Sequence, residues 1–201
     1  METSLPPEVA ENRKTEYPIH PLILGRWSPR SMTGEPISEQ DLMTLLEAAH
    51  WAPSSYNAQP WRFIYAFRET PEWDPLFSTL VPFNQEWAAK AGALVLVLSH
   101  KIFEHNQKPS ITHSFDAGAA WAYLALQGHV NGLVIHGMQG FDYEKAQELC
   151  KVPEDYQVEC MVAVGKRGKK EDLPASIQEK ETPSTRKPLS EVVMKGSFKQ
   201  N

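Results

Sequence analysis

The most constraining feature of this sequence is an uninterrupted apolar run, Ala93 to Ser99, near the middle of the chain. A strand with one solvated face alternates apolar and polar residues, and this run does not alternate. The pattern predicts a strand that is buried on both faces, so other elements must cover it from two sides. The longest apolar stretch, Ala91 to Leu98, is far shorter than the roughly 20 residues that a membrane helix needs. We therefore expect no membrane association.

Helix and strand patterns alternate on both sides of this central strand. Apolar residues recur at helical spacing after Ser38, a predicted N-cap, and the longest helical pattern spans Thr112 to Val130. Further strands are predicted at Trp61 to Phe67, Leu133 to His136 and Val158 to Val164, and further helices at Pro71 to about Leu80, Asn84 to Lys90 and Tyr143 to Cys150. Such alternation favours one domain of the α/β or α+β class with a central sheet.

Charge and cysteine content argue against several functional classes. With a net charge of −5, the chain lacks the basic balance that nucleic acid binding requires. Cys150 and Cys160 form no CxxC pair and the histidines follow no zinc-ligand spacing, so we expect neither a disulfide framework nor a metal site. The N-terminal residues contain no apolar signal-peptide core. These features predict a cytoplasmic protein.

The segment from Pro53 to Trp61 carries more hydrogen-bonding groups than a connector between a helix and a strand needs. Ser54, Ser55 and Asn57 stand between two prolines that stiffen the backbone. The segment is either a polar helix end capped by serine and asparagine or a ligand-binding loop.

Two other segments could contact a ligand. Arg26 and Arg30, with Ser28 between them, would form a compact anion site, because a guanidinium matches two phosphate oxygens. Arg186 is a second basic position, near the far end of the sequence. The alternative is that these arginines are solvated at the surface. The turn Gly137-Met138-Gln139-Gly140 would let a flat ligand approach the backbone, although an ordinary strand-to-helix turn can have this composition.

Taken in order along the chain, these motifs resemble the FMN-dependent nitroreductase family. They are Arg26-x-Ser28-x-Arg30, Pro53-Ser54-Ser55-x-Asn57-x-Gln59-Pro60-Trp61, Asn84, Gly137-Met138-Gln139-Gly140-Phe141-Asp142 and Arg186-x-Pro188-Leu189. The resemblance extends from about residue 20 to residue 195.

The resemblance implies an α+β fold in which helices surround a central mixed, mostly antiparallel sheet. It also implies an intertwined homodimer with FMN at the subunit interface. Three parts are expected: an N-terminal arm over residues 1–20, an FMN-binding domain over residues 21–166, and an extended C-terminal tail over residues 167–201. The tail would contact the partner subunit and the FMN phosphate.

The resemblance further implies which residues bind the cofactor. The phosphate, ribityl chain and pyrimidine edge would be held by Arg26, Trp27, Ser28, Arg30 and Arg186. The flavin of the other subunit would be contacted by Pro53, Ser54, Ser55 and Asn57. Asn84 would bond the pyrimidine edge, and one ring face would be covered by Gly137, Met138, Gln139 and Gly140, with a backbone N–H of residue 139 or 140 near N5. No catalytic side chain and no metal would be required.

The implied reaction is a ping-pong transfer of hydride from NAD(P)H, through N5 of FMN, to a nitroaromatic, quinone or related small-molecule acceptor. The alternatives are a flavin reductase or dehalogenase-like reaction on the same fold, or a flavin-binding dimer without catalysis. Three residues depart from well-known members: Gln139 replaces a glutamate, Ser184 a basic residue, and Trp87 a lysine found in some relatives. These departures bear on redox potential and substrate choice more than on FMN binding.

Overall fold

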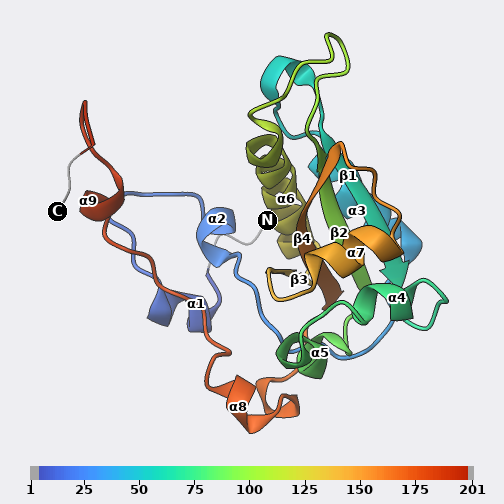
Figure 1. Ribbon diagram of the computed structural model, residues 1–201. Helices are drawn as coiled ribbons and strands as arrows, with labels where there is room; N and C mark the ends of the chain where they lie inside the picture. The colour runs from blue at the N-terminus through green and yellow to red at the C-terminus, as the bar shows by residue number, and fades with distance from the viewer. Residues whose placement is uncertain (1–4, 199–201) are drawn as a thin grey trace.

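In the computed structural model, which describes residues 5–198, four strands form one sheet in the order β1-β2-β4-β3 (Figure 1). The strands are β1 (Trp61–Phe67), β2 (Ala93–His100), β3 (Leu133–Met138) and β4 (Tyr156–Lys166). Neighbouring strands are antiparallel in every pair, so the described part of the sheet contains no parallel pairing. Helices lie on both sides of the sheet, which confirms the predicted α+β class.

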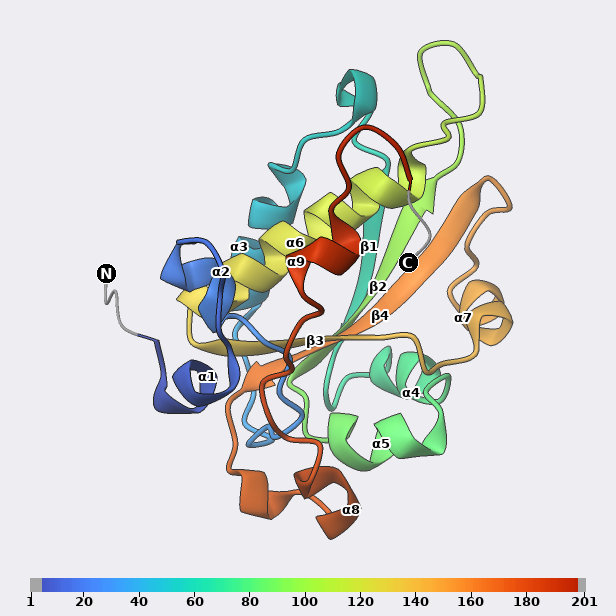
Figure 2. The ribbon, with the colours of Figure 1, turned by 90° about the vertical axis from the view of Figure 1, so that its left-hand side faces the viewer.

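The central strand β2 is buried on both faces, as its composition predicts. Leu94 and Leu96 belong to one apolar core, whereas Val95 and Val97 belong to a second core on the other face. The first core is covered by α4 (Trp73–Phe77), α5 (Pro82–Ala88) and α7 (Tyr143–Leu149). The second is covered by α3 (Glu39–His50) and α6 (His113–Val130), which crosses the sheet diagonally in Figure 2. This arrangement satisfies the alternating side chains of a strand with no polar face.

Helix α3 begins where the sequence predicts it, at a capping box. The Ser38 hydroxyl accepts the backbone N–H of Asp41 at 3.0 Å, and the Asp41 carboxylate accepts the N–H of Ser38 at 3.2 Å. Each bond satisfies an N–H that a helix start leaves without an intrahelical partner.

Two predicted helix boundaries near the first core are wrong. The helix expected from Pro71 begins later, at Trp73, because the Trp73 N–H donates to the Thr70 carbonyl in a preceding turn. The helix expected from Asn84 begins earlier, at Pro82, since proline fits the first helical turn, where its missing N–H is not needed.

Strand β3 is longer than predicted. Gly137 and Met138 pair with Val162 and Met161 of β4, so they continue the strand instead of breaking it. The Met138 side chain is buried in the first core. Only Gln139 and Gly140 form the connection to α7.

The two ends of the chain lie side by side, away from the sheet (Figure 1). The N-terminal end contains α1 (Pro7–Asn12) and α2 (Pro21–Gly25), and the C-terminal end contains η2 (Lys170–Asp172), α8 (Ala175–Gln178) and α9 (Leu189–Val192). From residue 5 to residue 198, no helix combines the length and apolar character needed to cross a membrane. Whether these ends behave as an arm and a tail separate from the domain over residues 21–166 stays a prediction.

Close packing between α6 and β3 depends on Gly128. A methyl group at this position would lie 2.2 Å from Ile135 Cγ1 and 2.5 Å from Ile135 Cδ1. We expect Gly128→Ala to lower the free energy of unfolding by about 2 kcal/mol through overpacking, measured by urea denaturation. Gly118→Ala is the matched control on the same helix, because nothing lies within 4 Å of its added methyl group. Equal midpoints for the two variants would contradict the expected clash.

Candidate functional site

The basic segment after α2 runs beside the C-terminal end of the chain. Arg26 Nη1 donates to Ser28 Oγ at 3.2 Å, and the Arg26 guanidinium lies 5.9 Å from the centre of the Trp121 ring on α6. Burial lowers the pKa of Arg26, and the charge of Arg186 lowers that pKa further. The structure thus brings together two basic positions from opposite ends of the sequence.

A third guanidinium, that of Arg13, joins this pair and was not predicted. Arg13 Nη1 donates to the carbonyls of Leu24 at 2.7 Å and Arg26 at 2.8 Å, and its Nε donates to the Ser184 carbonyl at 3.1 Å. All three partners are backbone oxygens. An arginine in a polar arm carries no sequence signal for contacts of this kind, so sequence reasoning could not identify it.

Glu181 fixes the other end of the basic segment and was also missed. Its carboxylate accepts the backbone N–H groups of Arg30 at 2.9 Å and Ser31 at 3.0 Å, and the Ser31 hydroxyl at 2.8 Å. Arg167 Nη1 donates to the same carboxylate at 2.5 Å, and its guanidinium lies 4.9 Å from the ring centre of Trp27. Burial raises the pKa of Glu181, but hydrogen bonds from Ser31, Arg30 and Arg167 outweigh burial and hold it below its usual value.

Arg30 has an unused donor at this site. Its Nη1 donates to the Lys180 carbonyl at 3.3 Å, but its Nε is buried and finds no hydrogen-bond partner among the described residues. Buried polar atoms are nearly always hydrogen-bonded in folded proteins, so this Nε indicates a missing acceptor.

Asn84 is bonded to the glycine turn. Its Nδ2 donates to the Gly140 carbonyl at 2.9 Å, and its Oδ1 accepts Trp87 Nε1 at 3.3 Å. A Cβ at residue 140 would lie 2.6 Å from Asn84 Nδ2, so glycine is required there by this contact. Asn84 holds the turn, and its amide keeps a second N–H for another acceptor.

His136 connects the glycine turn to the basic segment. Its Nδ1 lies 2.8 Å from the Pro29 carbonyl, and its ring centre lies 4.6 Å from that of Trp87. Burial is the main cause that lowers the pKa of His136 to about 4. The imidazole is therefore neutral at neutral pH, and its Nδ1–H donates to Pro29 because a carbonyl only accepts.

Trp121 fills the space beside Gly137. A Cβ at residue 137 would lie 2.9 Å from Trp121 Nε1, so the glycine admits the indole ring. This Nε1 is buried and, within residues 5–198, has no hydrogen-bond partner. It is the second unused donor near the predicted cofactor residues. Gln139 is exposed at the end of the same strand.

The polar loop after α3 has an unusual backbone. Tyr56, Asn57 and Gln59 adopt positive φ angles of 53°, 54° and 47°, which are uncommon for residues other than glycine. The Gln59 N–H donates to Ser54 Oγ at 3.0 Å, and the Ser55 N–H donates to Asp116 Oδ2 on α6 at 3.1 Å. The loop is therefore a fixed structure, η1 (Ser55–Asn57) with its flanks, and not a simple helix cap.

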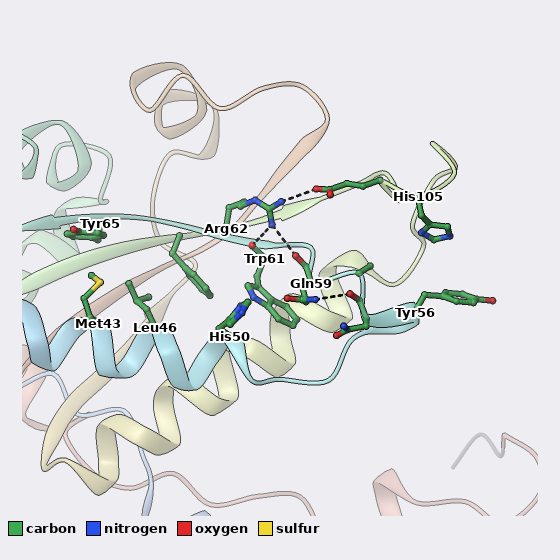
Figure 3. Close-up of a pocket in the computed structure, with 13 residues that line it drawn as sticks. Met43, Leu46, His50, Tyr56, Gln59, Trp61, Arg62, Tyr65 and His105 are labelled. Carbon is green, nitrogen blue, oxygen red and sulfur yellow. Dashed lines mark hydrogen bonds and ion pairs between the residues drawn. The ribbon is translucent and has the colours of Figure 1, made fainter.

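A cavity of about 660 Å³ lies between this loop, α3 and the edge strand β1. Figure 3 shows Met43, Leu46 and His50 projecting from α3 toward β1, while Tyr56 lines the cavity from the loop. Asn57 and Gln59 line the cavity, whereas Pro53 is exposed and is not one of its lining residues.

Within one chain, the loop and the basic cluster lie at opposite ends of α6. Ser55 bonds to Asp116 in the first turn of α6, whereas Gly25, next to Arg26, lies against His129 in its last turn. The predicted site residues therefore form two groups: Arg26, Trp27, Ser28, Arg30, Asn84, Gly137, Met138, Gln139, Gly140 and Arg186 in one, and Pro53, Ser54, Ser55 and Asn57 in the other.

The first group has the chemistry that FMN requires. Arg13, Arg26 and Arg186 form no ion pair with any described carboxylate, so their charges are available to a phosphate. The buried N–H donors of Arg30 and Trp121 lack acceptors, and a heteroaromatic ring with a polar chain carries groups of that kind. Among residues 5–198, no group of three or more histidine, cysteine, aspartate or glutamate side chains could hold a metal ion.

Known proteins that are similar to this chain include named oxidoreductases. Over 199 aligned residues the chain is 29% identical to the NADH dehydrogenase of Thermus thermophilus, covering 85% of this chain and 92% of that protein. A 63-residue segment is 38% identical to YdgI of Bacillus subtilis, provisionally named an NAD(P)H nitroreductase, and spans 29% of its length. A crystal structure described as an oxidoreductase containing FMN superposes with a TM-score of 0.90 at 44% identity, covering 94% of this chain and 97% of that one.

The family model described as "Nitroreductase family" matches residues 23–166, which contain β1 to β4, the basic segment, the loop and the glycine turn. This match spans well over half of the chain. The chain belongs to the nitroreductase family.

Proposed function

We propose that this protein is an FMN-dependent oxidoreductase that passes reducing equivalents from NAD(P)H to a nitroaromatic, quinone or related acceptor by a ping-pong mechanism. Membership of the nitroreductase family makes it an oxidoreductase. The observation that carries the proposal is the convergence of unpaired guanidinium groups and unpartnered buried N–H donors around the segment from Arg26 to Arg30. When bound, FMN supplies the two-electron chemistry, so the protein itself needs no nucleophile.

In this proposal the chain's own residues bind and orient the cofactor. Arg26, Ser28 and Arg186 take the phosphate, and the free Nε of Arg30 donates to the polar edge of the ring. Asn84 fixes Gly140, and His136 fixes Pro29, so the turn and the basic segment keep one relative position.

The three departures from well-known members fit this scheme. Trp87 is only 1% exposed and holds Asn84, Ser184 bonds Arg186 through its hydroxyl, and Gln139 adds no charge near the ring.

The proposal includes a homodimer, in which each site takes residues from both chains. Several large apolar side chains near the loop are exposed in the single chain: Trp51 at 74%, Tyr56 at 84%, Ile111 at 94% and Phe115 at 80%. Apolar exposure of this extent at one end of α6 is typical of a surface that a partner covers. The loop with Ser54, Ser55 and Asn57 would then complete the partner's site. A cytoplasmic location stays a prediction.

The absorbance spectrum of the purified protein tests the proposal. We expect a yellow protein with flavin bands that bleach when NADH or NADPH is added anaerobically and recover when a nitroaromatic or quinone is added. A colourless protein that cannot be reconstituted with FMN would refute it. Bleaching without reoxidation by any acceptor would indicate a flavin-binding dimer without turnover, and reoxidation by free flavin alone would indicate a flavin reductase.

A further inference from the structure

We propose that Arg13 joins the two ends of the chain into one anion site for a phosphate monoester, and that binding of the phosphate is what holds the C-terminal end in place. The proposal deepens the proposed function, since the phosphate of FMN would be the natural occupant. It adds a binding residue outside the family match, which begins at residue 23.

Three guanidiniums from three segments meet, and none of them is in an ion pair with a described residue. Arg13 comes from the N-terminal end, Arg26 from the segment after α2, and Arg186 from the C-terminal end. Burial lowers the pKa of Arg13, and the charges of Arg186 and Arg26 lower it further, as expected for like charges held close together. No described carboxylate forms an ion pair with any of the three. This repulsion opposes the observed arrangement unless an anion is present.

The hydrogen bonds of Arg13 show how the arrangement is held. Two of its nitrogens bond the carbonyls of Leu24, Arg26 and Ser184, so its side chain spans both segments that carry the other guanidiniums. Its Nη2 has no hydrogen-bond partner in the described part of the chain and remains for an acceptor. A phosphate oxygen can accept the N–H groups of this Nη2.

The cavity at this place is large enough and basic enough for a phosphate group with part of its ester. It has a volume of about 660 Å³, and Lys14 and Lys187 also line it, together with Glu16. The Glu16 carboxylate accepts the N–H of Leu189 at 3.1 Å and forms no ion pair with the arginines. Five cations therefore surround a space that contains one carboxylate.

The same cavity lies between the two ends of the chain. Binding of an anion in it is therefore coupled to docking of the C-terminal end on the N-terminal end. Beyond Glu181, the bonds from Arg13 to Ser184 and from Leu189 to Glu16 both join this end to residues 13–16. An anion that binds only the docked arrangement shifts the chain toward it by mass action.

Hydrogen exchange of the full-length protein tests this coupling. We expect inorganic phosphate to slow exchange of the amides over residues 184–193 by about tenfold, compared with sodium chloride at equal ionic strength. FMN should act in the same way, whereas riboflavin, which lacks the phosphate, should bind without this protection. Equal protection by riboflavin and FMN would overturn the proposal.

Variants of Arg13 test whether its hydrogen bonds to the phosphate, and not only its positive charge, are needed for phosphate binding. Arg13→Gln should weaken phosphate binding, measured by calorimetry, about tenfold or more and abolish the protection, while Arg13→Lys should restore part of both. Lys108→Gln, which removes a distant surface charge, is the control and should change neither. Unchanged phosphate protection in Arg13→Gln would overturn the role of Arg13. Protection by phosphate in a protein that does not bind FMN would support this inference while refuting the proposed function.

Discussion

Replacing Glu181 with glutamine is expected to lower the free energy of unfolding by about 3 kcal/mol, the largest stability effect that we predict. The side chain is fully buried and accepts four hydrogen bonds, from the N–H groups of Arg30 and Ser31, the Ser31 hydroxyl and Arg167. Glutamine has nearly the same shape as glutamate, but its amide NH2 group is a donor and cannot accept the hydrogen bonds that one carboxylate oxygen accepts. Buried donors left without an acceptor cost about 1–3 kcal/mol each, which accounts for the size of the effect.

Urea denaturation measures this loss, and Glu179→Gln provides a matched control. Glu179 lies two residues away on the same segment and is exposed, so its substitution should change stability by less than about 0.5 kcal/mol. The Glu181→Gln variant should also show faster hydrogen exchange over residues 28–31, because their backbone partner is weakened. If both variants unfold at the same urea concentration, the bonds of Glu181 do not stabilise the fold.

The contribution of Glu181 also depends on pH in a defined direction. Its pKa in the folded state is lower than in the unfolded chain, where glutamate titrates at about 4.3. The stabilisation is therefore fully present above this unfolded-state pKa and is lost as the pH falls through the folded-state pKa. The difference in stability between the natural protein and Glu181→Gln should shrink below about pH 4. A difference that stays constant from pH 7 to pH 3 would contradict the lowered pKa.

Replacing Arg30 with alanine is expected to give the largest functional effect. Its buried Nε lacks an acceptor, and a bond from it to the negatively charged reduced cofactor should contribute about 1.5–3 kcal/mol. We expect binding of FMN to weaken about tenfold and the two-electron midpoint potential to fall by about 30 mV. The reason is that the lost charge stabilises the reduced form more than the oxidised form.

Reductive titration and fluorescence titration of the reconstituted protein measure the two quantities. Arg68→Ala is the control, because Arg68 also has a buried, unpartnered Nε but bonds to Gly34 and Glu69, away from the predicted cofactor residues. Its substitution should leave both quantities unchanged. If Arg30→Ala has the potential and affinity of the natural protein, Arg30 does not contact the ring.

The sequence predicted the layered core of this protein with few errors. The run from Ala93 to Ser99 could only be a strand covered on both sides, and the structure places two separate cores against it. The start of α3 was equally predictable, because Ser38 and Asp41 satisfy the helix end through bonds three residues apart. The errors concern proline and glycine positions, where Pro82 can begin or end a helix and Gly137 can continue or break a strand. Tertiary packing decides between these alternatives, and the local sequence carries no information about that packing.

The motifs alone predicted the composition of the candidate site, whereas its organisation was implied only by the family resemblance. The loop from Pro53 to Trp61, the basic segment and the glycine turn were recognisable, because each gathers polar or small residues within a short stretch. Their division into two groups was implied by the family resemblance, which assigned the loop to the flavin of the other subunit. The composition of the motifs alone does not predict it, since it depends on how the loop docks on Asp116.

By itself, the sequence determined what depends on residues close together in the chain: the buried central strand, the capped helix, and the polar and basic motifs of the family. Only the tertiary structure decided the roles of Arg13, Glu181 and His136. Their partners are mostly backbone groups of residues distant in sequence, and any residue offers the same backbone groups. No spacing or composition rule can identify such contacts, because they exist only once the chain has folded.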